Sequence, residues 1–275
     1  MSYKLLNCGQ LNEVYINESI QLFGWCRRIR DHGKKLFIDL ADRYGTTQLV
    51  FESDIKIRAN ELNKEYVIKA LGKVKKRDVD TIDKSNLTGN VELFIDNFEI
   101  LNKSLPLPFE LTDEKNKSQP NEDLRLKFRY LDLRRRRIIK NIELRSNITK
   151  IIRLFFWEHN FLELETPTLV KDTYETGSRT FLVPSRIKKN NYYSLAQSPQ
   201  IYKQFCMIGG LDKYFQIARC YRDEDQRIDR QPEFTQVDIE VSFRDEKYIQ
   251  GLIEQLISII FKKILKLKKN NLFKD

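Results

Sequence analysis

The residues best suited to chemistry lie in two strand-like runs on either side of a charged loop. The second run, residues 236–243, alternates apolar side chains with polar ones that include Asp238 and Glu240. A period of two is typical of a half-buried antiparallel strand. The first run, residues 214–222, ends in Arg222, whose planar guanidinium suits a carboxylate or a phosphate. Acids, amides and an arginine on one strand face are the mixture that a site for a triphosphate and an amino acid needs.

The stretch from Tyr214 to Phe243 reads YFQIARCYRDEDQRIDRQPEFTQVDIEVSF, and it resembles motif 2 of class II aminoacyl-tRNA synthetases. Its RDED and DRQPEFTQVDIE segments are similar to the bacterial aspartyl-tRNA synthetase form. A charged hairpin at a sheet edge would account for an isolated arginine–glutamate pair, but not for matches in register along the whole stretch. A sister synthetase for asparagine or lysine shares this motif and stays an alternative.

The resemblance implies an activity and the residues that carry it. Aspartate would react with ATP to give aspartyl-adenylate and pyrophosphate. The 3′ end of tRNA-Asp, with tRNA-Asn as a further substrate, would then take the aspartyl group. Class II enzymes use no protein nucleophile, so Arg222 is the expected catalytic residue and stabilises charge together with Mg²⁺. The expected ATP-binding residues are Arg222, Asp223, Glu224, Gln231 and Glu240.

The amino-acid pocket is expected in the segment YSLAQSPQIYKQF, which is similar to the family's QSPQ element. Lys203 offers a compact positive charge for the side-chain carboxylate, and Gln200 can orient the rest of the substrate. A lone lysine on a helix is ordinarily solvated, so only the resemblance singles this one out. The expected aspartate-binding residues are Glu175, Gln200, Lys203, Arg222 and Asp238.

The loop that contains Glu175 departs from the family pattern. The family reads TPEG here, and its glutamate meets the substrate ammonium. This chain reads TYETG over residues 173–177, with Thr176 in the place of the glutamate. Either the loop shifts to present Glu175, or this contact is weakened.

Residues 1–103 predict a small β-barrel that would carry an RNA-binding face. Five short strands with one helix-like stretch after the third fit the OB-fold, a frequent binder of single-stranded nucleic acid. Turn signals such as Asp31-His32-Gly33 separate the strands. The expected strands are residues 21–30, 35–41, 46–51, 67–75 and 91–101, and the expected helix is residues 55–64.

The block from Gly24 to Phe51 resembles the anticodon-binding domain of the same family, in which positions matching Arg30, Phe37 and Gln48 contact the anticodon. Phe37 falls on the strand face opposite Leu36, Ile38 and Leu40, where it would be a stacking platform for a base rather than a core aromatic. In bacterial relatives a histidine at the position of His32 can accompany relaxed choice between the Asp and Asn tRNAs. The hypothesis is that this enzyme accepts both.

Residues 104–137 predict a hinge, because three prolines punctuate a polar stretch that cannot form a core. The run Arg134–Arg137 is open to two interpretations. It could neutralise tRNA phosphates, or it could be the solvated start of a helix.

Residues 138–275 predict a partial class II catalytic domain with an antiparallel sheet, so the fold class is α+β. Apolar residues recur at three- and four-residue steps up to His159. FLELETPTL then predicts a strand followed by Pro167, which is tolerated at an edge or a strand terminus. This helix and strand resemble motif 1, which builds the dimer interface of class II enzymes and implies a homodimer.

No Gly-rich segment like motif 3 follows Phe243. The chain is therefore expected to be a truncated enzyme, or else a non-catalytic fragment that binds the tRNA anticodon.

Bulk composition agrees with this interpretation without requiring it. The net charge of +10 favours an anionic partner, although a general richness in lysine accounts for part of it. The four cysteines form no CxxC pair, which argues against a zinc site, and no metal ligands are assigned. No apolar run is long enough to cross a bilayer, and the N-terminus lacks the apolar core of a signal peptide. A cytoplasmic protein is expected.

Overall fold

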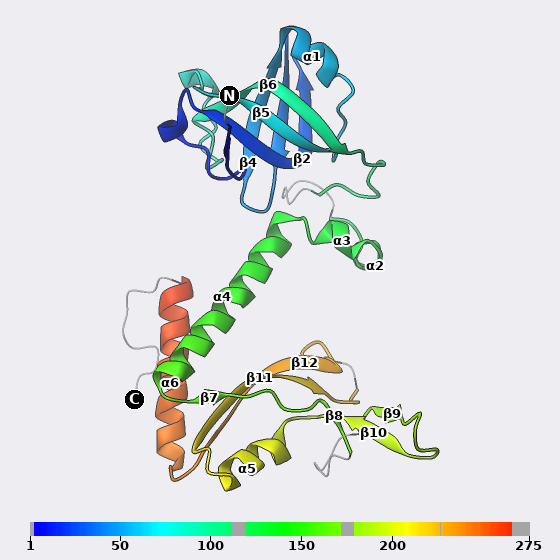
Figure 1. The fold of residues 1–275 in the computed structure, drawn as a ribbon, viewed down its shortest axis with the longest axis vertical. Helices are drawn as coiled ribbons and strands as arrows, with labels where there is room; N and C mark the ends of the chain where they lie inside the picture. The colour runs from blue at the N-terminus through cyan, green and yellow to red at the C-terminus, as the bar shows by residue number, and fades with distance from the viewer. Residues whose placement is uncertain (1–2, 112–118, 172–178, 226, 266–275) are drawn as a thin grey trace. The chain divides into compact units, whose positions relative to one another are not determined.

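The computed structural model describes residues 3–111, 119–171, 179–225 and 227–265. The chain divides into two compact units, Met1–Asn141 and Ile142–Asp275, and each unit is described by itself (Figure 1). No helix among the described residues is long and apolar enough to span a membrane.

A closed barrel makes up most of the first unit. Strand β2 pairs with β3, β3 with β4, β4 with β6 and β6 with β5, and β5 returns to pair with β2. This closure, with α1 between β4 and β5, is the OB-fold that the sequence predicts. The elements are β1 (Lys4–Leu5), η1 (Glu13–Tyr15), β2 (Ser19–Asp31), β3 (Lys35–Ala41), β4 (Thr46–Glu52), α1 (Ser53–Ala59), β5 (Val67–Lys76), η2 (Val79–Thr81) and β6 (Val91–Asn102).

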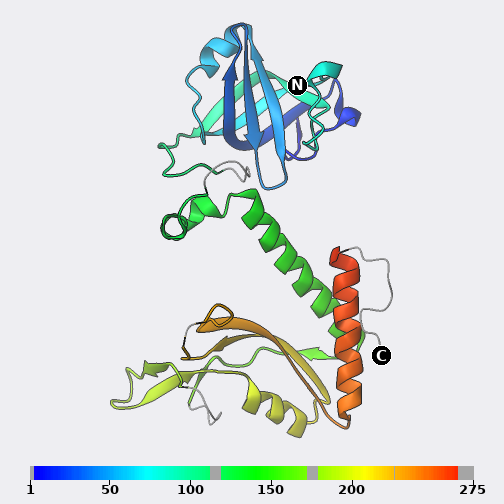
Figure 2. The same cartoon turned by 180° about the vertical axis from the view of Figure 1, so that it is seen from behind.

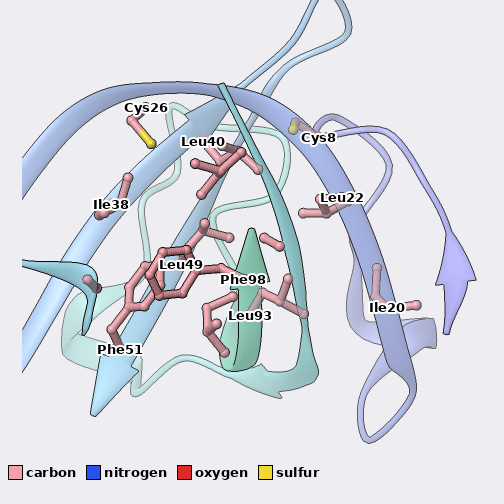
Figure 3. Packing of buried hydrophobic residues seen from close by; sticks show 14 of the residues in the cluster. Cys8, Ile20, Leu22, Cys26, Ile38, Leu40, Leu49, Phe51, Leu93 and Phe98 are labelled. Carbon is pink, nitrogen blue, oxygen red and sulfur yellow. The ribbon is translucent and has the colours of Figure 1, made fainter. Parts of the chain in front are cut away.

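Alternate residues of every barrel strand form the core. Leu22, Ile38, Leu49 and Leu93 are fully buried there, and the Phe51 and Phe98 rings meet edge to face at 5.6 Å (Figure 3). Alternation of this kind places the remaining residues of β3 and β4 on the outer face of the barrel. The barrel therefore presents an outward-facing set of side chains on a rigid scaffold.

The expected barrel strands are confirmed to within two residues, but the expected helix is wrong in extent. Residues 55–64 were predicted, whereas α1 starts at Ser53 and ends at Ala59. After α1 the chain turns, because the amide of Leu62 donates to the Ala59 carbonyl at 3.0 Å and Glu65 takes a left-handed conformation with φ of 66°.

Three helices follow the barrel: α2 (Glu122–Lys127), α3 (Arg129–Asp132) and α4 (Arg136–Glu158). Arg134 pairs with the buried Glu65 carboxylate, and its guanidinium lies 4.4 Å from the Trp25 ring centroid. Arg135 is buried and pairs with Asp132 at 3.4 Å. These two arginines stabilise the connector, so neither interpretation of the arginine run applies to them.

The second unit contains two small sheets. One orders β12–β11–β7 and the other orders β8–β10–β9. The elements are β7 (Leu162–Glu163), β8 (Leu169–Val170), β9 (Leu182–Pro184), β10 (Tyr192–Leu195), α5 (Gln200–Ile208), β11 (Lys213–Tyr221), β12 (Glu233–Val241) and α6 (Glu246–Leu265). The strand expected before Pro167 in FLELETPTL is β7, which is only two residues long. After Pro167 the chain continues into β8, which belongs to the other sheet.

Helices α4 and α6 pack on one face of the β11–β12 pair, and α5 lies on the other (Figures 1 and 2). The apolar face contributes Phe215, Ile217, Ile239 and Val241 to a core with Phe155 and Phe156 of α4. Phe243 does not join this core as its place in the apolar run implied. It follows the end of β12 with φ of 58°, and 96% of its surface is exposed.

Candidate substrate site on the β11–β12 sheet

The register of β11 and β12 gathers polar side chains on the sheet face away from the apolar core. Gln216 pairs with Asp238, and Tyr214 pairs with Glu240. Their chain neighbours Phe215 and Ile239 enter the core on the opposite face. A strand whose side chains alternate between faces can therefore support a core with one face and a site with the other.

Lys203 of α5 lies over this polar face. Its Nζ atom is 3.1 Å from Asp238 Oδ1 and 3.2 Å from Glu240 Oε2, and its side chain is only 13% exposed. An ammonium has three N–H donors, so two carboxylate contacts leave one donor for a ligand. The cluster places a positive charge where an incoming carboxylate can meet it.

Burial and the neighbouring charges shift the pKa values of Lys203 and Asp238 in opposite directions. Burial raises the pKa of Asp238 above its ordinary value, although Lys203 acts in the opposite direction. Burial alone would lower the pKa of Lys203, but the Asp238 and Glu240 carboxylates outweigh it, and the pKa is raised. The lysine is therefore held in its charged form at neutral pH.

A hydrogen-bond network that the sequence did not reveal supports the floor of the cluster. The Tyr214 hydroxyl donates to Gln216 Oε1 at 2.6 Å, and the Thr166 hydroxyl donates to the same oxygen at 2.9 Å. The Tyr214 hydroxyl also lies beside the Asp238 carboxylate and acts to lower the pKa of Asp238. Asp238 Oδ2 is buried and has no hydrogen-bond partner among the described residues. A buried acceptor of this kind can receive a ligand ammonium.

A cavity of about 460 Å³ opens where β11 ends and the loop to β12 begins. It is lined by Arg222, Glu224, Ile228, Asp229, Arg230, Gln231 and Phe234. The amide of Arg222 donates to the Pro232 carbonyl at 2.8 Å, which fixes the arginine one residue beyond the strand. Arg230 donates to Glu224 Oε2 at 3.0 Å across the loop. The cavity thus combines a guanidinium, an amide and an aromatic ring.

Phe234 is a cavity residue that the sequence argument missed. The Arg222 guanidinium lies 5.1 Å from the centroid of its ring. Phe234 and Asp238 are four residues apart on one face of β12, which is about 13 Å along a strand. An extended ligand can therefore lie along the sheet with one end at Phe234 and the other at Lys203.

The outer face of the barrel brings together the residues expected to read an anticodon. Arg30 forms a two-point pair with Asp39 at 2.9 and 2.6 Å and also donates to Gln48 Oε1 at 3.1 Å. Phe37 is half-buried outside the barrel core, so it is not a core aromatic. The His32 ring meets it edge to face at 5.5 Å.

Two models of known protein families match this chain. A family model described as OB-fold nucleic acid binding domain matches residues 20–101. A second, described as tRNA synthetases class II (D, K and N), matches residues 121–274, more than half of the chain. The chain belongs to the class II tRNA synthetases.

Curated relatives of this synthetase are named for aspartate. The aspartate–tRNA(Asp/Asn) ligase of Borrelia garinii subsp. bavariensis is 47% identical over 273 residues, which cover 99% of this chain and 46% of the relative. The aspartate–tRNA ligase of Halalkalibacterium halodurans is 47% identical over 94% of this chain and 43% of the relative. The chain therefore spans about half the length of the curated relatives that it matches.

The fold is also similar to that of solved synthetases. The asparaginyl-tRNA synthetase from Pyrococcus horikoshii, solved with asparaginyl-adenylate, aligns with a TM-score of 0.81 at 23% identity. The alignment covers 98% of this chain and 61% of that chain. The expected resemblance to class II synthetases and the expected fold class are confirmed.

Six of the synthetase residues expected from sequence fall into two groups in space. Arg222, Glu224 and Gln231 line the cavity, whereas Lys203, Asp238 and Glu240 form the cluster on the sheet. Gln200 begins α5, one turn before Lys203.

Besides Gln200, two expected residues are in neither set of contacts. Asp223 does not line the cavity, since its amide donates to the Arg179 carbonyl at 3.1 Å and its backbone forms a bridge there. Glu175 lies outside the described residues.

Proposed function

We propose that the chain carries the amino-acid-activating and anticodon-reading parts of an aspartate–tRNA ligase, which acts on tRNA-Asp and also on tRNA-Asn. The observation that supports this best is Lys203, held charged between two carboxylates with one donor unused. This arrangement suits an amino acid with a carboxylate side chain. An asparagine side chain, which is neutral, would gain much less from the ammonium. We therefore propose aspartate as the substrate.

In the proposed reaction each side chain of the two sites on the sheet would have one task. The aspartate α-carboxylate oxygen attacks the α-phosphorus of ATP, a P–O bond forms, and pyrophosphate leaves. The tRNA 3′-terminal ribose hydroxyl then attacks the acyl carbon, and AMP leaves. Lys203 would hold the side-chain carboxylate, Asp238 Oδ2 the ammonium and Arg222 the α-phosphate, while Phe234 would stack on adenine. Catalysis would come from positioning and charge stabilisation.

Magnesium is expected with ATP, since ATP is handled as its Mg²⁺ complex in such sites. Among the described residues no group of three histidine, cysteine, aspartate or glutamate side chains is placed to hold a metal ion. These residues do not make a protein cage for Mg²⁺, so the ion would be held chiefly by the phosphates.

The barrel face is proposed to bind the anticodon through Arg30, Phe37 and Gln48. Support comes from their position on one outer face, where a half-buried ring lies beside fixed hydrogen-bonding groups. A ring in this position can stack on a base, and the polar groups can read its edge. Acceptance of tRNA-Asn is supported by His32 beside Phe37 and by the Asp/Asn name of the Borrelia relative.

A homodimer is also proposed, and the outer side of α4 supports it. Ile142, Leu154 and Trp157 are 51%, 38% and 51% exposed on this helix. They line a shallow hollow of about 490 Å³ together with Arg145, Ser146, Thr149, Lys150 and Arg153. Exposed apolar residues that are rimmed by polar ones are typical of an interaction surface.

Binding of aspartate by the full 275-residue chain tests the proposed activity. Isothermal calorimetry should detect aspartate binding that is at least tenfold tighter than asparagine binding, because only aspartate has a carboxylate for Lys203. Lys203→Gln should weaken aspartate binding by at least tenfold. The control is Lys188→Gln, since Lys188 is an exposed lysine between β9 and β10. Equal aspartate affinity in the wild type and Lys203→Gln would refute the proposed role of this lysine.

A further inference from the structure

An apolar row crosses the outer face of the barrel beside the proposed anticodon residues. Phe37 on β3 is the register partner of Val50 on β4, and Val50 is the register partner of Phe94 on β6. Val50 is only 1% exposed, yet it does not belong to the buried core cluster of the barrel. It must be covered from outside, by the side chains that flank it. The row therefore joins two aromatic rings on the solvent side of the barrel.

Lysines surround the second ring of this row. Lys75 Nζ lies 3.6 Å and Lys35 Nζ lies 5.4 Å from the centroid of Phe94. Lys73 is the register partner of Phe94 on β5 and is exposed.

The carboxylates near this ring are already engaged. Glu52 pairs with Lys35 at 2.5 Å, and Glu92 accepts a hydrogen bond from Gln48 at 2.8 Å. The surroundings of Phe94 are thus aromatic and predominantly cationic, and they are continuous with the face that holds Phe37.

A backbone irregularity fixes the position of Phe94. The register of β5 against β6 shifts between Leu71 and Gly72. A Cβ atom at Gly72 would lie 2.1 Å from the Phe94 carbonyl oxygen, so only glycine permits this close approach. Bulges of this kind direct particular side chains and are frequent at the rims of barrels and beside functional sites. The close approach of Gly72 and the register shift therefore fix the backbone position of Phe94 in β6.

We propose that Phe94 is a second stacking platform, for an unpaired base next to the base that binds at Phe37. The two rings are two strand spacings apart, about 10 Å, so neighbouring nucleotides of one RNA strand can reach both. A base that stacks on Phe94 replaces the Lys75 ammonium, which then faces the phosphate together with Lys35 and Lys73. Aromatic platforms beside cations are the usual means of binding unpaired nucleotides. This inference rests on the proposed anticodon-binding function.

The test is binding of an anticodon stem-loop RNA to the full chain, with 2-aminopurine at each loop position in turn. Phe94→Leu keeps an apolar cover over Val50 but removes the aromatic face. It should weaken binding about tenfold, the lower part of the range for loss of one stacked base. It should also abolish the fluorescence quenching at one loop position. Phe94→Tyr should restore both. The control is Phe23→Leu, since Phe23 is also an exposed barrel phenylalanine paired in register with a lysine, Lys69.

The outcomes separate this inference from the function on which it rests. If Phe37→Leu weakens binding and Phe94→Leu has no effect, Phe94 is not a platform and the proposed anticodon face stands. If the wild-type chain fails to bind the stem-loop, or if Phe37→Leu and Phe94→Leu are both without effect, the anticodon face itself is refuted. Phe94→Leu with the thermal stability of the wild type and about tenfold weaker binding would support the inference.

Discussion

At the scale of single residues, carboxylates are buried in this protein where cations surround them. Asp132 is fully buried beside Arg125, Arg129 and Arg135. A buried carboxylate without such partners would be strongly destabilising, because the loss of hydration is not offset. The same logic holds for Asp238 beside Lys203, but there the ion pair leaves polar atoms unused. In the Asp132 cluster three guanidiniums surround one carboxylate, whereas Asp238 Oδ2 of the candidate site has no hydrogen-bond partner among the described residues.

The pH dependence of stability should reveal the Asp132 cluster. Burial acts to raise the pKa of Asp132, but the Arg125 hydrogen bond and the three guanidinium charges outweigh it and lower the pKa below the ordinary value of 3.8. A carboxyl group whose pKa is lowered by folding stabilises the folded state at pH values above its ordinary pKa. This stabilisation is lost as the pH falls through the lowered pKa. Asp132→Asn should therefore reduce the free energy of unfolding by about 2 kcal/mol near neutral pH. The difference from the wild type should disappear in acid, below pH 3.8.

The measurement is urea unfolding followed by Trp25 fluorescence in a Trp157→Phe background, so that the first unit alone is observed. Asp123→Asn is the control, because Asp123 is an exposed acid on α2. If the free energy of unfolding of Asp132→Asn stayed below that of the wild type by the same amount down through the acid range, the cluster would not act through the charge of Asp132.

The site was predictable to the extent that the polar face of a period-two strand carried carboxylates. Asp238 and Glu240 were found because carboxylates on a strand face are unusual, and Lys203 was found by resemblance. Tyr214 and Phe234 were missed because aromatic residues in strands ordinarily signal core packing. Their roles depend on which face they share and on hydrogen-bond partners distant in sequence, such as Thr166. That information lies in the register of the sheet and not in any single strand.

At the scale of elements, the end of α4 shows how one residue directs the chain into the site. Asn160, the second residue after the helix, takes φ of 60°, and the amide of Phe161 donates to the Phe156 carbonyl at 2.9 Å. This reversal satisfies a terminal carbonyl of the helix. It also brings Phe161 into the core beside Phe156, from which β7 starts along β11.

Substitution of Asn160 should separate backbone conformation from side-chain contacts. Asn160→Ala should destabilise the second unit by about 1 kcal/mol, because a Cβ-bearing residue without a polar side chain is disfavoured in the left-handed region. Asn160→Gly should be at least as stable as the wild type, since glycine adopts this conformation freely. Urea unfolding followed by Trp157 fluorescence would measure both. Equal loss of stability in the alanine and glycine variants would mean that the asparagine side chain, and not its conformation, is what matters.

Elements with strong periodicity were predicted well, and those set by tertiary pairing were not. The barrel strands and α4 agree closely with the sequence pattern because each has a continuous apolar face. A strand that ends at Pro167 was predicted, and β7 does precede this proline but is only two residues long. The strand β8 that follows Pro167 pairs in a different sheet. No local signal distinguishes those partners.

At the scale of the whole molecule, each unit has its own core, and the chain spans about half the length of its curated relatives. The second unit buries one side of α4 in its core through Ile152, Phe155 and Phe156. The opposite side leaves Trp157 and its neighbours exposed. A long helix that is apolar on two sides needs two partners. One is the sheet, and the proposed homodimer would supply the other.

Self-association should therefore depend on the outer side of α4. Sedimentation equilibrium of the wild-type chain should show a concentration-dependent dimer, and Trp157→Glu should shift the protein to monomer, because a carboxylate at the centre of an apolar contact is costly to desolvate. Ile187→Glu is the matched control, since Ile187 is 89% exposed in the turn between β9 and β10. A dimer that survives Trp157→Glu unchanged, or a wild-type chain that is monomeric at every concentration, would contradict the α4 interface. Loss of the dimer in Trp157→Glu alone, with unfolding of the second unit unchanged, would place the contact on this helix.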